Sequence, residues 1–506
     1  MNVAIPYHLQ RLWSASFLAK CALVALVAFL MFFFAAASVI LPWWFVLVVV
    51  LFPIVLVAAL AMPVFGLFIM LVLVCGLVPE SLSPSIKLGA GQVKAHELFM
   101  LLMLGFALAR RDAINSLKPY VGWLLPVFGI LALTVSAVMV AFFIYRTAPR
   151  DIFSDARNFL GWLPLFCLVG MIRTQQQLTR LQKSIIALGL LVSLAALLQF
   201  FTGRSFVQNA RVEELATLSQ SLDLTRSIVG ASNYFLIFSL YLLLARMMTG
   251  STSVLAASPL VVFLVAGLVV NFGRGVWLTS LGGAILLAYW LAGWRGIGRI
   301  VVAGLLGLAL ALGALALAKP KIIEAAYERL VSATSEKFER DTSLGWRLEE
   351  VTDATEKIQG SPFVGVGVGT AYKPLIRMNG RSTTVSDEVM TRYIHNAYVG
   401  LWLKLGILGP LCVAAIIWGV LRRGLKMARE AKDVKTKALS LTIVASFVVP
   451  VVTSITQPEW LDQTGIAFFA TVLALQIIVH RLATAGEPEI RTFGIPKRAE
   501  QAAIVL

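Results

Sequence analysis

Apolar runs of about 17 to 25 residues recur along almost the whole chain, and this pattern leaves few folds open. Each run is long enough to cross the hydrocarbon core of a bilayer as a helix. Hydrophobic residues make up 59% of the chain and charged residues 14%, whereas soluble domains carry about 25% charged residues. We therefore predict an all-α, polytopic integral membrane protein with about 12 to 14 transmembrane helices and one long periplasmic loop.

The candidate spans are separated by short polar loops, and several of them are short or abut one another. The first resembles a signal peptide but is followed at once by another apolar run, so we predict an uncleaved anchor. The spans lie near residues 18–40, 43–61, 64–79, 96–109, 120–144, 158–172, 184–201, 228–247, 257–273, 275–293, 300–318, 397–421, 438–455 and 464–480.

The net charge of +17 is explained by loop orientation rather than by nucleic-acid binding, because no basic helix or aromatic-basic module accompanies it. Lys and Arg gather in alternate loops, which the positive-inside rule assigns to the cytoplasm together with both termini. The expected organisation is transmembrane helices with short loops (1–318), a large periplasmic loop with amphipathic helices (319–395), C-terminal transmembrane helices (396–480) and a cytoplasmic tail (481–506).

The polar segments on the predicted outer side are rich in arginine, including Arg157, Arg226 and Arg274. A guanidinium group matches phosphate oxygens bidentately and stays charged at any working pH. Arg274 lies between two closely spaced apolar runs, so it must sit at or inside the membrane interface, where a charge is costly. It therefore either binds an anion or snorkels to phospholipid headgroups.

The long loop contains an amphipathic helix predicted from Ser343 to Gln359, with Gly360, Ser361 and Pro362 ending it. Arg347 lies on its apolar stripe with Leu344, Val351, Ala354 and Ile358, while the acidic residues are expected on the opposite face. An arginine on the stripe facing the membrane domain meets either an anionic ligand or a buried salt-bridge partner.

Alternating glycines follow this helix at Gly365, Gly367 and Gly369. A dinucleotide-binding motif is excluded because no βαβ unit surrounds them. We expect these glycines to let the backbone fold tightly against the membrane domain, with the alternative that their amides face a ligand phosphate.

His395 opens the next apolar segment, followed by Asn396 and Tyr398. A histidine where a polar loop meets the bilayer can perform proton chemistry on a lipid-linked substrate, although a lone histidine at such a place is more often structural. His96 is the second candidate base. Four outer carboxylates could orient a histidine: Glu213, Glu214, Asp387 and Glu388. No metal-ligand spacing is present, so neither a catalytic metal nor another cofactor is expected.

Together, these elements resemble the bacterial O-antigen ligase and O-antigen polymerase superfamily of polytopic membrane glycosyltransferases. The resemblance covers about residues 200 to 420 and rests on the order of its pieces around one long outer loop. The matching pieces are Arg226 near the end of an outer loop, Arg274-Gly275, Arg347, the turn from Pro362 to Gly369, and His395-Asn396 followed by Leu405-Gly406-Ile407-Leu408-Gly409.

The resemblance implies an inverting, metal-independent transfer of a glycan from undecaprenyl pyrophosphate to an acceptor hydroxyl in the bacterial inner membrane. It gives His395 the role of general base or acceptor holder, and Arg226, Arg274 and Arg347 the role of binding the pyrophosphate, with Arg157 a weaker addition. Asn396, Tyr398 and the three glycines would support the site. The acceptor would be lipid A core or a second lipid-linked glycan, with no nucleic acid involved.

Three other functions compete with this one. A transporter or flippase for lipid-linked oligosaccharide usually shows repeated halves and midplane charges, and the chain has no visible repeat. A protein O-oligosaccharyltransferase would need a protein acceptor, and no extra soluble domain is visible to bind one. A scaffold protein would leave the outer arginines without a purpose.

Overall fold

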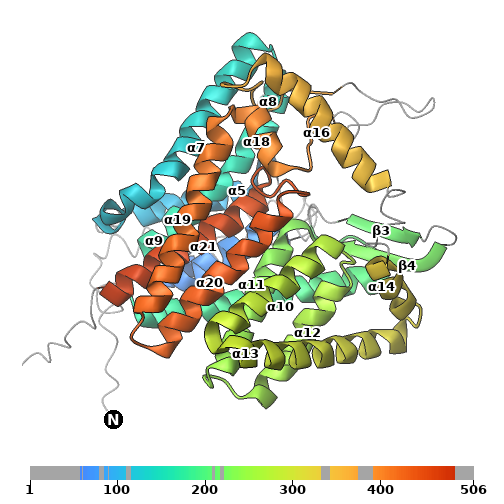
Figure 1. Cartoon of the computed structure of the whole chain (residues 1–506). Coiled ribbons are helices and arrows are strands. Elements are labelled where there is room, and N and C mark those ends of the chain that lie inside the picture. The colour runs from blue at the N-terminus through green and yellow to red at the C-terminus, as the bar shows by residue number, and fades with distance from the viewer. Residues whose placement is uncertain are drawn as a thin grey trace, which may run out of the picture. The chain divides into compact units, whose positions relative to one another are not determined.

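The computed structural model describes residues 57–59, 61–78, 85–88, 91–109, 115–207, 211–216, 221–331, 342–373 and 391–484. The chain divides into two compact units, Met1–Met62 and Pro63–Leu506. Every element named below belongs to the second unit (Figure 1). The predicted span at 18–40, most of that at 43–61, and the tail from residue 485 lie outside the described residues.

Helices dominate the described residues, which confirms the prediction of an all-α, polytopic membrane protein. The helices are α4 (Pro63–Val74), α5 (Ala95–Ala109), α7 (Val121–Met139), α8 (Pro149–Ala156), α9 (Leu163–Met171), α10 (Gln175–Thr202), α11 (Asn233–Met248), α12 (Val254–Val269), α13 (Arg274–Ala318), α14 (Ile322–Val331), α16 (Thr342–Gly360), α18 (Ala397–Leu405), α19 (Leu408–Glu430), α20 (Val434–Thr453) and α21 (Gln463–Thr484). Shorter helical turns are η2 (Lys118–Tyr120), η3 (Val140–Ile144), η4 (Arg157–Trp162) and η5 (Gly230–Ser232).

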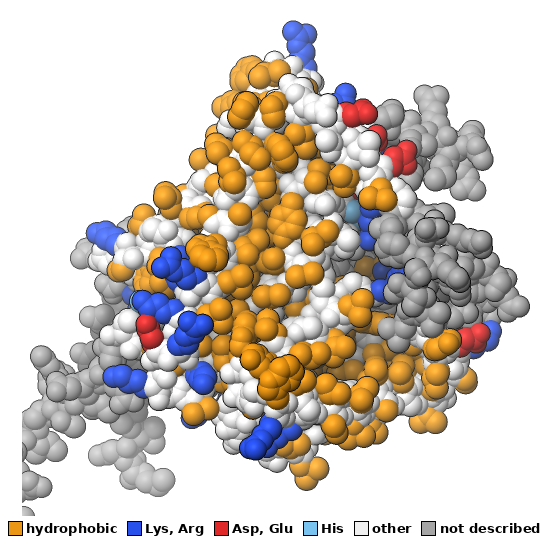
Figure 2. Space-filling model, in the orientation of Figure 1, with side chains coloured by type: hydrophobic (Ala, Val, Ile, Leu, Met, Phe, Trp, Pro, Cys, Tyr) orange, Lys and Arg blue, Asp and Glu red, His pale blue; other side chains and the backbone are white. Residues whose placement is uncertain are grey.

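Eight helical segments among the described residues are long and apolar enough to cross a membrane, and three shorter apolar helices accompany them. The eight are Asn115–Ile144, Gln175–Thr202, Gly230–Met248, Arg274–Arg299, Val301–Ala318, Leu408–Glu430, Val434–Thr453 and Gln463–Thr484. Hydrophobic side chains cover the middle of the face shown in Figure 2, and most Lys and Arg side chains lie near its edges. This distribution suits a surface in contact with lipid.

Two short antiparallel hairpins were not predicted. Strands β1 (Ser85–Leu88) and β2 (Gly91–Lys94) form one, and β3 (Arg211–Ala216) and β4 (Ser221–Ile228) form the other. The second hairpin leads directly into η5 and α11, so it positions Arg226 close to the start of a membrane helix.

The structure differs from the predicted spans at three places. Segment 158–172 is a 3₁₀ turn, η4, followed by the nine-residue α9. A Cβ atom on Gly161 would lie only 2.5 Å from the carbonyl oxygen of Gln463, so this turn packs directly against α21. Segment 397–421 is broken at Gly406, whose φ is 72°, because the chain at Phe363 crosses there and Ile407 donates to the Pro362 carbonyl at 3.1 Å.

The third difference concerns the predicted spans 275–293 and 300–318, which form one helix, α13, bent at Ala292 and Gly293. Figure 1 shows its two parts running in different directions. Gly293 has a φ of 61°, which a residue without a side chain adopts easily. The predicted cytoplasmic loop carrying Arg295 and Arg299 is therefore helical.

Candidate functional site

The candidate site centres on His395 and Glu350, which lies on α16. One carboxylate oxygen of Glu350, Oε2, accepts hydrogen bonds from the His395 backbone amide at 3.0 Å and from Nδ1 of its ring at 2.8 Å. The Glu350 side chain is 2% exposed and the His395 side chain 22%. Because an ionised carboxylate only accepts, this contact places a proton on Nδ1 and leaves Nε2 as the ring atom that can receive one.

The other oxygen of Glu350 is also occupied. Oε1 accepts from Nζ of Lys373 at 3.0 Å, in an ion pair buried on both sides. Burial alone raises the pKa of Glu350, but the hydrogen bonds from the His395 ring and amide and from Lys373 outweigh it and lower the pKa from 4.5 to about 2. Glu350 is therefore a carboxylate at any pH at which the protein works.

Further contacts hold the His395 ring in place. The Tyr393 ring meets it edge-on, with centroids 4.8 Å apart. The hydroxyl of Tyr372 donates to the carbonyl of Tyr393 at 2.8 Å, and the Tyr372 amide donates to the carbonyl of Thr391 at 3.1 Å. On the other side, Oδ1 of Asn396 accepts from two amides at the start of α18, both at 3.1 Å. The predicted supporting residue Asn396 is thus the N-cap of α18.

The glycine turn packs backbone against backbone, as the sequence predicted. Gly365, Gly367 and Gly369 have φ values of 75°, 86° and 78°. A Cβ atom on Gly365 would lie 2.6 Å from the Leu403 carbonyl oxygen, and one on Gly367 2.6 Å from that of Ala137. The alternative that these amides bind phosphate has no support at Gly365 or Gly369, since both donate within the protein, to the Ser361 carbonyl and to Asp155.

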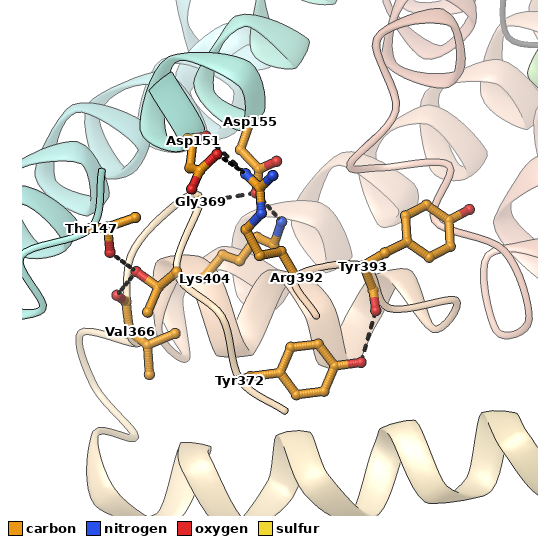
Figure 3. A network of polar contacts seen from close by, with 10 residues as sticks. Thr147, Asp151, Asp155, Val366, Gly369, Tyr372, Arg392, Tyr393 and Lys404 are labelled. Carbon is orange, nitrogen blue, oxygen red and sulfur yellow. Dashed lines mark hydrogen bonds and ion pairs between the residues drawn. The ribbon is translucent and has the colours of Figure 1, made fainter. Parts of the chain in front are cut away.

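An ion-pair network fastens this turn to α8 (Figure 3). Oδ2 of Asp155 accepts from the Gly369 amide at 3.0 Å and also binds the ammonium group of Lys404 on α18. One turn earlier on α8, Oδ1 of Asp151 lies 3.1 Å from Nη1 of Arg392. Two carboxylates of α8 therefore bind the end of the glycine turn at Gly369 and the segments before and after His395, at Arg392 and Lys404.

Two arginines predicted to bind the pyrophosphate, Arg226 and Arg274, lie near the turn between α12 and α13. Nε of Arg226 donates to the carbonyl of Asn271 at 3.0 Å, and Arg274 is the first residue of α13. Between them, the buried Phe272 has a φ of 50°, an uncommon conformation for a residue with a side chain. The structure thus places the guanidinium of Arg226, from β4, against the tight turn that leads into Arg274.

Helix α20 connects this turn to the His395 region. The hydroxyl of Tyr398, a predicted supporting residue, donates to the carbonyl of Val451 at 2.6 Å. On α13, a Cβ atom on Gly283 would lie 3.0 Å from Val449. Arg274 lies nine residues before Gly283, about 13 Å along the helix toward its N-terminus. Helix α20 therefore contacts both the His395 region, through Tyr398, and α13, the helix that begins at Arg274.

The other predicted residues divide between the site and its surroundings. Arg347 is half-buried on α16, one turn before Glu350. Arg157 lies apart, where its guanidinium contacts the carbonyl of Gln92 at 3.2 Å and the carboxylate of Glu97 at 3.8 Å. The second candidate base, His96, is buried, and its Nε2 lies 3.0 Å from Oε1 of Gln463.

The expectation that the acidic residues of α16 lie opposite its apolar stripe is wrong for Glu350, which is 1% exposed. The helical spacing does place Glu350 on the apolar stripe, because it lies three residues after Arg347 and four before the buried Ala354. Among the proposed partners for histidine, Asp387 and Glu388 lie outside the described residues, and so do the side chains of Glu213 and Glu214. In the part of the chain that the structure describes, no three His, Cys, Asp or Glu side chains gather in a way that could hold a metal ion.

Comparison with known families bears directly on this site. Residues 259–414 match the family model described as O-antigen ligase. This match supports membership of the O-antigen ligase family. The matched segment begins within α12 and includes Arg274, Arg347, the glycine turn and His395. Membership of the O-antigen ligase family supports a glycan-transferring enzyme of lipopolysaccharide biosynthesis. No curated protein matches the chain.

Proposed function

We propose that this chain transfers a glycan from undecaprenyl pyrophosphate to an acceptor hydroxyl at the periplasmic face of the bacterial inner membrane. The acceptor is lipid A core in a ligase, or a second lipid-linked glycan in a polymerase. The observation that carries the proposal is the 2.8 Å contact between Nδ1 of His395 and the ionised Glu350. It gives a histidine the tautomer and orientation that a general base requires.

In the proposed reaction, Nε2 of His395 takes the proton of the acceptor hydroxyl as its oxygen attacks the anomeric carbon. The bond from that carbon to the phosphate oxygen breaks, and the pyrophosphate leaves with the electron pair, so the anomeric configuration inverts. Glu350 stabilises the imidazolium that forms, as a carboxylate does behind other histidine bases. No metal or cofactor takes part in these steps.

Arg226 and Arg274 are the proposed partners of the leaving pyrophosphate. Arg274 is the first residue of α13, Arg226 contacts the turn just before it, and the first amides of that helix have no side-chain cap. Guanidinium groups beside a helix N-terminus favour a phosphate and stabilise the charge that grows on it. Arg347, one turn from Glu350 on α16, is proposed to contact the same donor. Arg157 is the weakest member of this set, because its guanidinium already contacts Glu97 and Gln92.

The proposed orientation follows from the loop charges. Lys and Arg are frequent at the ends of α19 and α20 opposite His395, which the positive-inside rule assigns to the cytoplasm together with both termini. His395 and the turn that bears Arg274 then face the periplasm, where lipid-linked glycans are joined.

The test uses purified protein in detergent with an undecaprenyl-pyrophosphate oligosaccharide, chelator, and either lipid A core or a second donor as acceptor. We expect transfer that resists the chelator and is lost in His395→Ala. The acceptor used distinguishes ligase from polymerase. Absence of transfer to either acceptor, together with movement of the donor across proteoliposome membranes, would instead establish a flippase.

A further inference from the structure

A pocket of about 640 Å³ lies beside the candidate site, between α8 and the segments 369–373 and 391–392. Its polar lining includes Tyr145, Thr147, Asp151, Thr370, Lys373 and Arg392. Several of these residues appear in Figure 3, where Asp151 and Arg392 face each other from opposite segments. A volume of this size holds one or two sugar rings.

The lining suits a hydroxyl-rich ligand. The Thr370 hydroxyl donates to the Val366 carbonyl at 2.9 Å and lies 2.8 Å from the Thr147 hydroxyl, so the two hydroxyls present acceptor lone pairs to a ligand. Asp151 and Arg392 form an ion pair at 3.1 Å, which presents an acceptor and several donors side by side. The side chain of Asp151 remains 35% exposed, and Tyr145 adds a half-exposed ring against which an apolar sugar face can pack.

The pocket connects directly to the proposed base. Lys373 lines it and binds Oε1 of Glu350 at 3.0 Å, while Oε2 of the same carboxylate binds His395 at 2.8 Å. The pocket lining therefore touches the carboxylate that orients His395, on the Nδ1 side of the ring. A saccharide bound here reaches Nε2 only with a hydroxyl that extends beyond this ion pair.

The pocket also borders the membrane surface. Tyr145 directly follows η3, a π-helical turn at the end of the candidate span Asn115–Ile144. On this turn Phe142, Phe143 and Ile144 are 48%, 69% and 68% exposed. Because they end a membrane-crossing helix, these side chains face lipid at the level of the interface. One surface thus runs from lipid-facing aromatic side chains through Tyr145 into a polar pocket.

We propose that this pocket binds the saccharide of a lipid-anchored acceptor whose acyl chains lie against Phe142, Phe143 and Ile144. The inference rests on the proposed function, since it names the second substrate of that reaction. It assigns the acceptor side to α8 and the donor side to the turn between α12 and α13. A soluble saccharide or a protein acceptor would gain nothing from the apolar turn.

The experiment measures equilibrium binding of lipid A core, without donor, to the full chain in nanodiscs. Ala148→Trp is the test variant, because Ala148 lines the pocket and is exposed. Phe153→Trp is its matched control, since it places the same side chain on α8 at an exposed position outside the pocket lining. The same core saccharide with its acyl chains removed tests the apolar turn.

We expect Ala148→Trp to raise the Kd for lipid A core by about tenfold or more and Phe153→Trp to leave it unchanged. Removing the acyl chains should weaken binding to the wild type, and this loss should shrink when Phe142 and Phe143 are both replaced by Ser. Equal Kd values for the two Trp variants, or no binding to the wild type, would overturn the inference. Binding that follows this pattern without any transfer in the assay above would contradict the proposed function alone.

Discussion

Glu350 binds His395 twice through a single oxygen, once to the backbone amide and once to the ring. The two residues lie 45 positions apart, on a loop helix and at the start of a membrane segment. Any movement of α16 relative to α18 therefore breaks both bonds together. The orientation of the proposed base depends on the docking of this loop helix.

Glu350→Gln tests that dependence. An amide can donate to Nδ1 and thereby favour the opposite ring tautomer, with the proton on Nε2 where the acceptor must be deprotonated. We expect kcat to fall by about 10²- to 10⁴-fold while the protein is still expressed and inserted. The matched control is Glu349→Gln, the exposed neighbouring carboxylate on the same helix, which should keep wild-type turnover. A normal kcat in Glu350→Gln would remove Glu350 from the mechanism.

Arg274→Lys tests the proposed pyrophosphate site. Lysine keeps the charge but loses the bidentate fork, and a hydrogen bond to a charged group contributes about 1.5 to 3 kcal/mol. The donor KM should therefore rise, or kcat/KM fall, by roughly 10- to 100-fold. Arg295→Lys, an exposed position beyond the bend of the same helix, is the control and should behave as the wild type. Full activity of Arg274→Lys would reduce Arg274 to a simple point charge.

Gly367→Ala tests the backbone contact of the glycine turn. The new methyl group would lie 2.6 Å from the Ala137 carbonyl oxygen, at a φ of 86°. The strain of an alanine in left-handed backbone and the overpacking together lower the free energy of unfolding by about 2 to 5 kcal/mol, so the Tm in detergent should fall clearly. Gly345→Ala is the contrasting variant: it lies exposed in α16 with open space around it. It should stabilise slightly, by about 0.5 to 1 kcal/mol. Equal Tm values for the two variants would contradict the contact.

Glu459 makes the stability of the chain depend on pH. It lies in the loop between α20 and α21, and its Oε1 accepts from the hydroxyl of Tyr234 at 2.6 Å. Burial raises the pKa of its carboxyl from 4.5 to about 8, with a smaller contribution from Asp462. The folded protein therefore keeps a proton that the unfolded chain loses above pH 4.5. The contribution of Glu459 to the free energy of unfolding is therefore fully present below pH 4.5 and declines as the pH rises toward 8.

Glu459→Gln should remove most of that decline, because glutamine can accept the same hydrogen bond without ionising. The measurement is the Tm in detergent between pH 5 and 8. We expect the wild type to lose Tm across this interval and the variant to lose less. Parallel curves for both proteins would show that Glu459 does not retain its proton in the folded state.

The sequence predicted the parts of this site that follow from local pattern. The glycine turn and the amphipathic helix 343–359 depend on neighbours within a few residues. The contact of Glu350 with His395 and the pair Asp155–Lys404 could not be predicted in this way, since these partners lie 45 and 249 positions apart. Lys404 gave a signal that it needs a partner, because it is a cation within an apolar segment.

The hairpins and the bend in α13 escaped prediction for different reasons. Strands β1 and β2 have four residues each, and such a short strand does not show a clear alternation of apolar and polar residues. In α13, arginines after the bend suggested a loop, but their side chains are compatible with a helix that continues beyond it. Hydropathy indicates where a chain can cross a membrane, and it does not distinguish a bend from a loop.

The glycine turn has a consequence for how this family can vary. Gly365, Gly367 and Gly369 approach α18, α7 and α8 mainly through main-chain atoms, and the Ala141 methyl group and the Asp155 carboxylate are the side chains that take part. Main-chain atoms are the same whatever residues surround them, so lipid-facing and core side chains of those helices can change without shifting the contact. A site anchored in this manner can keep its geometry while the sequence around it diverges, provided that the glycines and Asp155 are retained.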